Sequence, residues 1–205
     1  MEQSLGHLWI PAMGGAAVTW LVANLMAIAR RTGSALDWYR LSGLVEAALA
    51  VDVALGTHQY AWLALGLGWG VGKVWAVPAI LRRSLPLGVY EVKTRATPSL
   101  MLGSAALVGI LAWAAGVSGL LLAALLTPFW LLTQRREVWL QAILLMEAEI
   151  ALGFLSLGLS SAVGLADFLA LAELLAMAVL LAWLYRRGAM DLPSLTTDTM
   201  KELRG

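Results

Sequence analysis

Long apolar runs separated by short polar segments are the main pattern of this chain. The first run, Leu8–Ala29, is at about 1.5 Å per residue long enough to cross the roughly 30 Å hydrocarbon core of a bilayer. Two further runs, Leu41–Gly56 and Gln59–Leu81, follow a polar segment that begins at Arg30, and they meet at the weakly polar turn 56–59. We therefore predict three membrane-spanning helices in the first part of the chain.

The second part continues this pattern after the polar segment Arg82–Thr97. The run Pro98–Thr133 is too long for one crossing, and Gly116–Gly119 is the expected reversal between a short helix and a second one. Two more helices and a polar tail complete the chain, at Val138–Ser160, Ala162–Tyr185 and Arg186–Gly205. The pattern predicts an all-α, polytopic membrane protein with about seven transmembrane helices. It forms a single integral membrane domain over residues 1–205, with helices one to three and a cytoplasmic loop in 1–97 and helices four to seven in 98–205.

The basic residues fix the orientation of these seven helices. Alternating the sides of seven crossings brings 13 of the 14 basic residues to one side, and the positive-inside rule makes that side cytoplasmic. The N-terminus is therefore predicted outside and the C-terminus in the cytoplasm, whereas Lys73 alone lies inside a helix. The 13 residues are Arg30, Arg31, Arg40, Arg82, Arg83, Lys93, Arg95, Arg135, Arg136, Arg186, Arg187, Lys201 and Arg204.

Composition supports the membrane class and excludes several kinds of site. Apolar residues make up 60% of the chain and charged residues 13%, against about 45–50% and 25% in soluble domains. The absence of cysteine excludes disulfides, thiolate-held iron–sulfur clusters and Cys-based zinc sites, so we expect no cofactor and no metal in this chain. His7 and His58, at outer helix ends, are a weak candidate pair for haem or a metal. The short basic loops follow from topology, and we predict no binding to nucleic acid.

Ionisable side chains inside the apolar runs are the strongest functional signal. Each costs roughly 2.5 to 3.5 kcal/mol at the centre of a transmembrane helix, so function is the default interpretation. Lys73 and the mid-helix carboxyls Glu149 and Glu173 are the leading candidates, and the whole set comprises Glu46, Asp52, Lys73, Glu147, Glu149, Asp167 and Glu173. Asp167, at the start of its helix, can equally be an interfacial residue. The predicted proton-relay residues are Glu173, Glu149, Glu147, Lys73, Glu46 and Asp52.

Spacing separates these candidates further. Glu147 and Glu149 lie about 200° apart around a helix and therefore face different neighbours. Glu46 is one turn inside the cytoplasmic boundary, where it can reach water or Arg40 instead of acting in a site. Buried carboxyls beside a lysine can hold and pass protons near neutral pH, although the sequence does not exclude sodium coordination.

Closely spaced glycines mark the predicted helix that carries Lys73. The run from Gly66 to Gly72 lacks the spacing of a nucleotide-binding loop and follows no strand, so we exclude that reading. Its two overlapping G-x-x-x-G pairs, Gly66 with Gly70 and Gly68 with Gly72, instead predict close approach of neighbouring helices.

Four motifs in order along the chain resemble the hydrogenase-4 membrane component E family. They are Arg40-Leu41-Ser42, Gly72-Lys73-Val74-Trp75-Ala76-Val77-Pro78, Thr133-Gln134-Arg135-Arg136 leading to Leu145-Met146-Glu147, and the ending Asp198-Thr199-Met200-Lys201-Glu202-Leu203-Arg204-Gly205. The last two helices and the tail also resemble subunit K of respiratory complex I. By this resemblance the two mid-membrane glutamates of subunit K fall on Glu149 or Glu147 and on Glu173, and Lys73 matches the lysine that component E carries before Val and Pro.

The resemblance implies a membrane-arm subunit of a complex I-related, ion-translocating assembly, such as a group 4 nickel–iron hydrogenase or a formate hydrogenlyase-like complex. Its implied partners are antiporter-like and other membrane subunits, the lipid bilayer and, indirectly, a soluble redox arm. It carries no catalytic or redox centre of its own, and it resides in the cytoplasmic (inner) membrane of a bacterium or archaeon. Two alternatives remain open, a freestanding small ion or solute transporter and a purely structural membrane scaffold.

Overall fold

The computed structural model describes residues 2–29, 32–84, 98–114, 119–134, 138–159 and 164–188. These residues form seven helical rods and contain no strand, as the apolar runs predict. The third rod is continuous but consists of three segments, α3, η1 and α4. The elements are α1 Glu2–Ile28, α2 Thr32–Thr57, α3 Tyr60–Trp69, η1 Gly70–Ala76, α4 Val77–Ser84, α5 Pro98–Ala114, α6 Gly119–Gln134, α7 Val138–Leu159 and α8 Leu165–Gly188.

The second helix is longer than the sequence pattern predicts. It begins at Thr32, two turns and more before the predicted start at Leu41. The apolar run does not include this first part of the helix, because polar residues there alternate with apolar residues that face the core. Ala35, Leu36 and Tyr39 are all fully buried. Packing of that stripe against the core extends the helix beyond the stretch that hydropathy alone marks.

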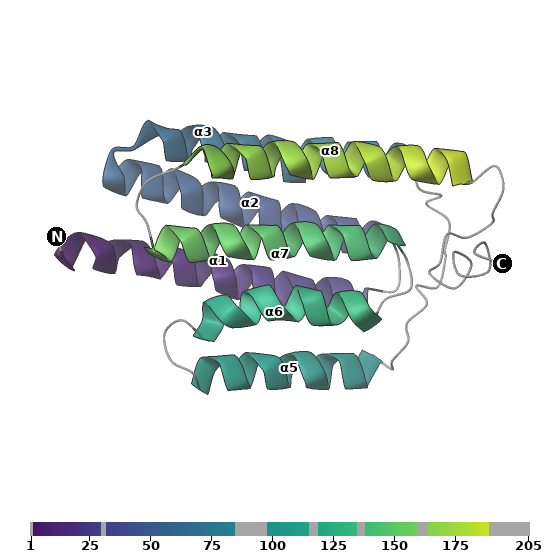
Figure 1. Ribbon diagram of the computed structural model, residues 1–205, viewed down its shortest axis with the longest axis horizontal. Coiled ribbons are helices and arrows are strands. Elements are labelled where there is room, and N and C mark those ends of the chain that lie inside the picture. The colour runs from purple at the N-terminus through teal and green to yellow at the C-terminus, as the bar shows by residue number, and fades with distance from the viewer. Residues whose placement is uncertain are drawn as a thin grey trace.

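The rods run roughly side by side in a bundle (Figure 1). Helix α1 packs against α2, α6 and α7, and α5 lies outside α6. The third rod packs against α2, and α8 packs against α4 and touches α7 more lightly. Four helices, α1, α2, α6 and α7, thus supply most of the interior, while α5 and α8 lie at its margins.

The third rod contains a π-helical segment, η1. There the backbone N–H of Val77 donates to the carbonyl of Gly72, five residues back, in place of the usual four. Pro78 follows directly, and because proline lacks an N–H and crowds the carbonyl four residues before it, a locally widened turn relieves the clash. The segment carries Lys73, and π-helical turns within α-helices are frequent at functional sites.

The glycine pairs of the third rod allow close approach of neighbouring helices, as the sequence predicts, and the structure shows that they face two different helices. Gly66 and Gly70 face α2, and a Cβ at Gly66 would lie 2.8 Å from the Cβ of Ala50. Gly68 and Gly72 face α8, where a Cβ at either position would meet Leu171. Small residues on both faces therefore bring α2 and α8 close to the rod that carries Lys73.

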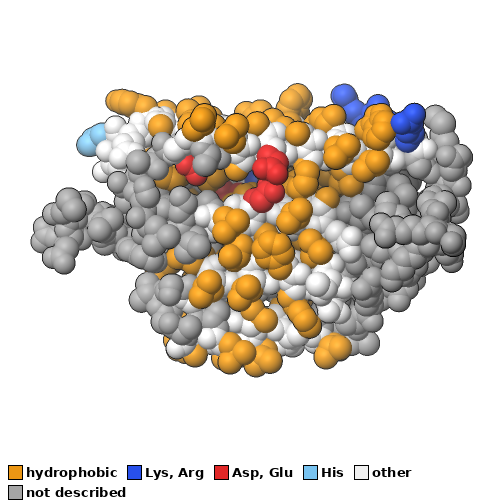
Figure 2. Space-filling view, viewed as in Figure 1, with side chains coloured by type: hydrophobic (Ala, Val, Ile, Leu, Met, Phe, Trp, Pro, Cys, Tyr) orange, Lys and Arg blue, Asp and Glu red, His pale blue; other side chains and the backbone are white. Residues whose placement is uncertain are grey.

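Large apolar side chains cover the outside of the bundle. Leu55, Trp75, Leu100, Trp113 and Leu169 are each more than half exposed, and apolar atoms spread over the face in Figure 2, whereas Lys and Arg atoms gather at one end. Within the described residues, two helical stretches are long and apolar enough to cross a membrane, Tyr60–Ser84 and Asp167–Leu184. The sidedness of the bundle stays a prediction.

Tryptophans near the predicted helix ends divide between surface and core. Trp183 and Trp130 are exposed, in the manner of an interfacial belt. Trp62, near the start of α3, is only 3% exposed and lies in the core, so it does not belong to such a belt. The side chains of Trp9 and Trp139 lie outside the described residues.

Candidate functional site

Lys73 lies at the centre of a buried ionic cluster. Its ammonium donates to both carboxylate oxygens of Glu46, at 2.8 and 3.0 Å, and to Oε1 of Glu147 at 3.1 Å. It also donates to Oγ of Ser42 at 2.7 Å. All four side chains are completely buried. The structure thus brings together three predicted site residues, from η1, α2 and α7, and adds a hydroxyl that the prediction omitted.

Local geometry explains how three helices deliver these groups to one point. Ser42 and Glu46 are four residues apart, so both point to the same face of α2. Gly43, between them, permits close approach of η1, since a Cβ there would lie only 2.5 Å from the Cβ of Lys73. Glu147 completes the cluster from α7. A glycine beside two polar groups on one helix face is therefore part of the site.

The charges of this cluster do not balance when every group is ionised. Two carboxylates face one ammonium, and the hydroxyl of Ser42 donates to Oε1 of Glu147 at 2.7 Å while accepting from Lys73. The second oxygen of Glu147 is buried and has no hydrogen-bond partner among the described residues. Because a net buried charge is costly, one added proton on either carboxyl group makes the cluster neutral and more favourable. This arrangement can take up and release a proton.

Tyr39 covers the cluster on one side. The ammonium of Lys73 lies 4.8 Å from the centre of its ring, within the range of a cation–π contact. Its hydroxyl donates to the sulfur of Met146 at 3.6 Å. Sequence reasoning missed both Tyr39 and Ser42 as site residues. The signal that could have found them is their spacing with Glu46, since positions 39, 42 and 46 share one face of a helix.

Glu149 and Glu173 form a second acidic group between α7 and α8. Glu149 is half-buried and Glu173 is exposed, and the two charges lie within electrostatic reach of each other. Acidic side chains gather in the middle of this face, between α8 and α7 (Figure 2). Glu149 also lies within electrostatic reach of Tyr39, so the two acidic regions are neighbours. Glu147 and Glu149 face opposite sides of α7, as their angular separation predicts.

The contacts of Glu46 and Asp167 decide between the alternatives that the sequence left open for them. Glu46 does not reach water or Arg40, so that alternative is wrong. It is fully buried against Lys73, and Arg40 instead pairs with Asp37 at 3.7 Å. Asp167 accepts a hydrogen bond from the backbone N–H of Gly164 at 2.8 Å and thereby caps the start of α8.

Asp52 and the histidines lie apart from the cluster. Asp52 is exposed on α2, six residues and about 9 Å along the axis from Glu46. His58 is exposed in the turn between α2 and α3 with φ at 56°, and the side chain of His7 lies outside the described residues. In the described part of the chain, no three His, Asp or Glu side chains are arranged to hold a metal ion.

No family model, curated protein or solved structure matches this chain. The resemblance to component E and to subunit K therefore stays a prediction.

Proposed function

We propose that this chain is a proton-relaying membrane subunit of a complex I-related, redox-driven ion-translocating assembly in a bacterial or archaeal cytoplasmic membrane. In this role the Lys73 cluster holds an exchangeable proton within the bilayer. Glu149 and Glu173 pass protons or shift charge between that cluster and a neighbouring subunit. The electrons travel in other subunits, since this chain has no cysteine to hold an iron–sulfur cluster.

The observation that carries the proposal is the unbalanced charge of the Lys73 cluster. Two carboxyl groups, one ammonium and a buried carboxylate oxygen without a hydrogen-bond partner among the described residues meet where no side chain is exposed. A purely structural ion pair is favoured when the charges cancel and every polar atom is bonded. An excess carboxyl group instead favours a role in proton exchange.

The position of Glu149 and Glu173 supports a lateral direction for the relay. Glu149 lies two residues from Glu147 on α7, and it is within electrostatic reach of Tyr39 at the cluster and of Glu173 on α8. The cluster is fully buried, whereas Glu173 is exposed. A partner membrane subunit that covers α8 is therefore the natural acceptor or donor of the proton.

Exposed apolar surface supports the membrane part of the proposal. Monomeric soluble proteins rarely expose contiguous apolar patches beyond a few hundred Å². Here leucines on α2, α3, α5 and α8 and tryptophans on α5 and α8 are exposed. In addition, two helical stretches are long and apolar enough to cross a bilayer. In lipid the same side chains face acyl chains at no cost.

Recovery of the tagged protein from its native membrane in mild detergent tests the assembly. Mass spectrometry of everything that migrates with it on a native gel is expected to find large antiporter-like membrane subunits and a metal-containing soluble arm. Recovery of the chain alone, or only with itself, contradicts the assembly and favours a freestanding transporter. Recovery from the soluble fraction contradicts the membrane part itself.

Charge-neutral variants test the relay within the purified assembly in sealed vesicles. The double variant Glu149→Gln with Glu173→Gln is expected to lose most proton translocation per redox turnover while the complex still assembles. Asp52→Asn removes one carboxylate of the predicted relay set, but from an exposed position apart from the cluster, and it is expected to keep normal coupling as a control. Full coupled translocation in the double variant contradicts the relay. Loss of assembly in that variant, with normal coupling in what remains, favours a structural scaffold.

A further inference from the structure

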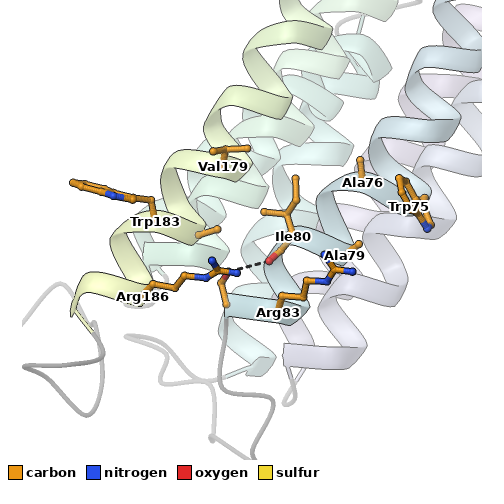
Figure 3. Close-up of a pocket in the computed structure, with 10 residues that line it drawn as sticks. Trp75, Ala76, Ala79, Ile80, Arg83, Val179, Trp183 and Arg186 are labelled. Atoms are coloured by element: carbon orange, nitrogen blue, oxygen red, sulfur yellow. Dashed lines mark hydrogen bonds between the residues drawn. The ribbon is translucent and has the colours of Figure 1, made fainter.

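A groove of about 420 Å³ opens between the ends of the third rod and α8. Its walls are small or apolar, with Ala76, Ala79 and Ile80 from the third rod (Figure 3) and Val179 and Ala182 from α8. Because three of these five residues are alanines, small side chains line much of the space between the two helices. The groove has the size of an ordinary small-molecule site.

Two arginines lie at one end of this groove. Arg83 and Arg186, one from each helix, both line it and are both exposed, and no acidic residue is among the lining residues. Within the described part of the chain, neither has an ion-pair partner. Of their neighbours in sequence, Arg82 donates to Asp37 at 2.7 Å, and Arg187 lies 4.9 Å from the centre of the Trp183 ring in a cation–π contact.

We propose that this groove binds an anionic phospholipid, with its phosphate between Arg83 and Arg186 and an acyl chain along the apolar walls. Charge complementarity carries this assignment, since two arginines without acidic neighbours favour a phosphate and the apolar walls favour a chain. Trp75 and Trp183, both exposed at the groove, suit the interface between headgroups and acyl chains. The inference rests on the membrane part of the proposed function and is independent of the proton relay.

Native mass spectrometry of the complex or chain, extracted from its membrane and stripped of lipid by detergent exchange, tests this site. We expect more adducts with phosphatidylglycerol than with phosphatidylcholine of the same acyl chains. Arg83→Gln with Arg186→Gln is expected to weaken phosphatidylglycerol binding roughly fivefold for each arginine removed. Arg82→Gln with Arg187→Gln removes the same charge from the adjacent positions and is expected to leave binding within about twofold of the wild type.

Several outcomes overturn the inference. Equal binding of the two lipids removes the headgroup preference, and equal weakening in both double variants indicates diffuse attraction instead of a site. Glycerol phosphate that displaces the lipid at equal concentration shows that the groove holds no acyl chain. Val179→Phe, which fills the groove without changing its charge, is expected to reduce adducts, and unchanged adducts with unchanged circular dichroism contradict the proposed pose. A protein recovered in the soluble fraction overturns the proposed membrane function first, so the two failures are distinguishable.

Discussion

The Lys73 cluster and the Glu149–Glu173 pair are built from the same kind of residue in neighbouring helices, yet they differ in balance and access. The cluster holds both signs of charge, is closed to the outside and has four hydrogen bonds to one ammonium. The pair holds two like charges and reaches the exposed side of α8. The comparison indicates that the buried Lys73 cluster is suited to store a proton, whereas the Glu149–Glu173 pair is suited to exchange a proton with the outside.

Removal of the central cation should have the largest effect on stability. Lys73→Met leaves Glu46 and Glu147 buried without a cation, and loss of one partner of a buried ion pair costs about 3–5 kcal/mol. We expect a large drop in the unfolding temperature in detergent or loss of folded protein. Adding Glu46→Gln and Glu147→Gln to the same chain should recover part of that stability. A Lys73→Met protein as stable as the wild type would contradict the ionised cluster.

The close approach of α2 and η1 can be tested at Gly43. Gly43→Ala places a methyl group 2.5 Å from the Cβ of Lys73, and overpacking of this kind costs about 1–3 kcal/mol. Gly56→Ala on the same helix is the matched control, because nothing lies within 4 Å of a Cβ there. Thermal unfolding should separate the two variants, and equal unfolding temperatures would contradict the contact.

Ser42 tests the hydrogen bonds that the sequence prediction omitted. Ser42→Ala removes a donor to Glu147 and an acceptor for Lys73, and we expect a loss of about 1–2 kcal/mol in unfolding free energy. Ser84→Ala is the control, since among the described residues the hydroxyl of Ser84 donates within its own helix, to the carbonyl of Ile80 at 3.0 Å. Denaturant titration measures both, and an effect no larger than that of the control would argue against a role for Ser42.

The acidic pair should give the smallest stability change. Glu149→Gln or Glu173→Gln removes one of two like charges without breaking an ion pair, so unfolding free energies should stay within about 0.5 kcal/mol of the wild type or rise slightly. Lys73→Met, measured alongside, should be clearly less stable. If Glu149→Gln destabilises the protein as much as Lys73→Met does, the contrast between the two regions disappears.

The sequence anticipates the helices and much of the candidate site, for identifiable reasons. Apolar runs mark the seven rods, and a lysine deep in such a run marks Lys73. Hydropathy does not mark the buried stripe that contains Ala35 and Tyr39, so the predicted start of the second helix at Leu41 is wrong. Hydropathy also cannot decide whether Glu147 or Glu149 contacts Lys73, because this choice depends on how α7 is rotated in the bundle. The prediction that Glu46 can reach water is wrong because α2 begins at Thr32, which puts Glu46 about four turns inside the helix.

Infrared difference spectroscopy tests the central claim, an exchangeable proton in the Lys73 cluster, most directly. The purified protein in lipid nanodiscs is compared at several pH values, and the C=O stretch of protonated carboxyl groups is followed. We predict a band that disappears in the variant Glu46→Gln with Glu147→Gln and persists in Asp52→Asn. A spectrum in which the double variant changes no carboxyl band at any pH where the protein stays folded would contradict the account.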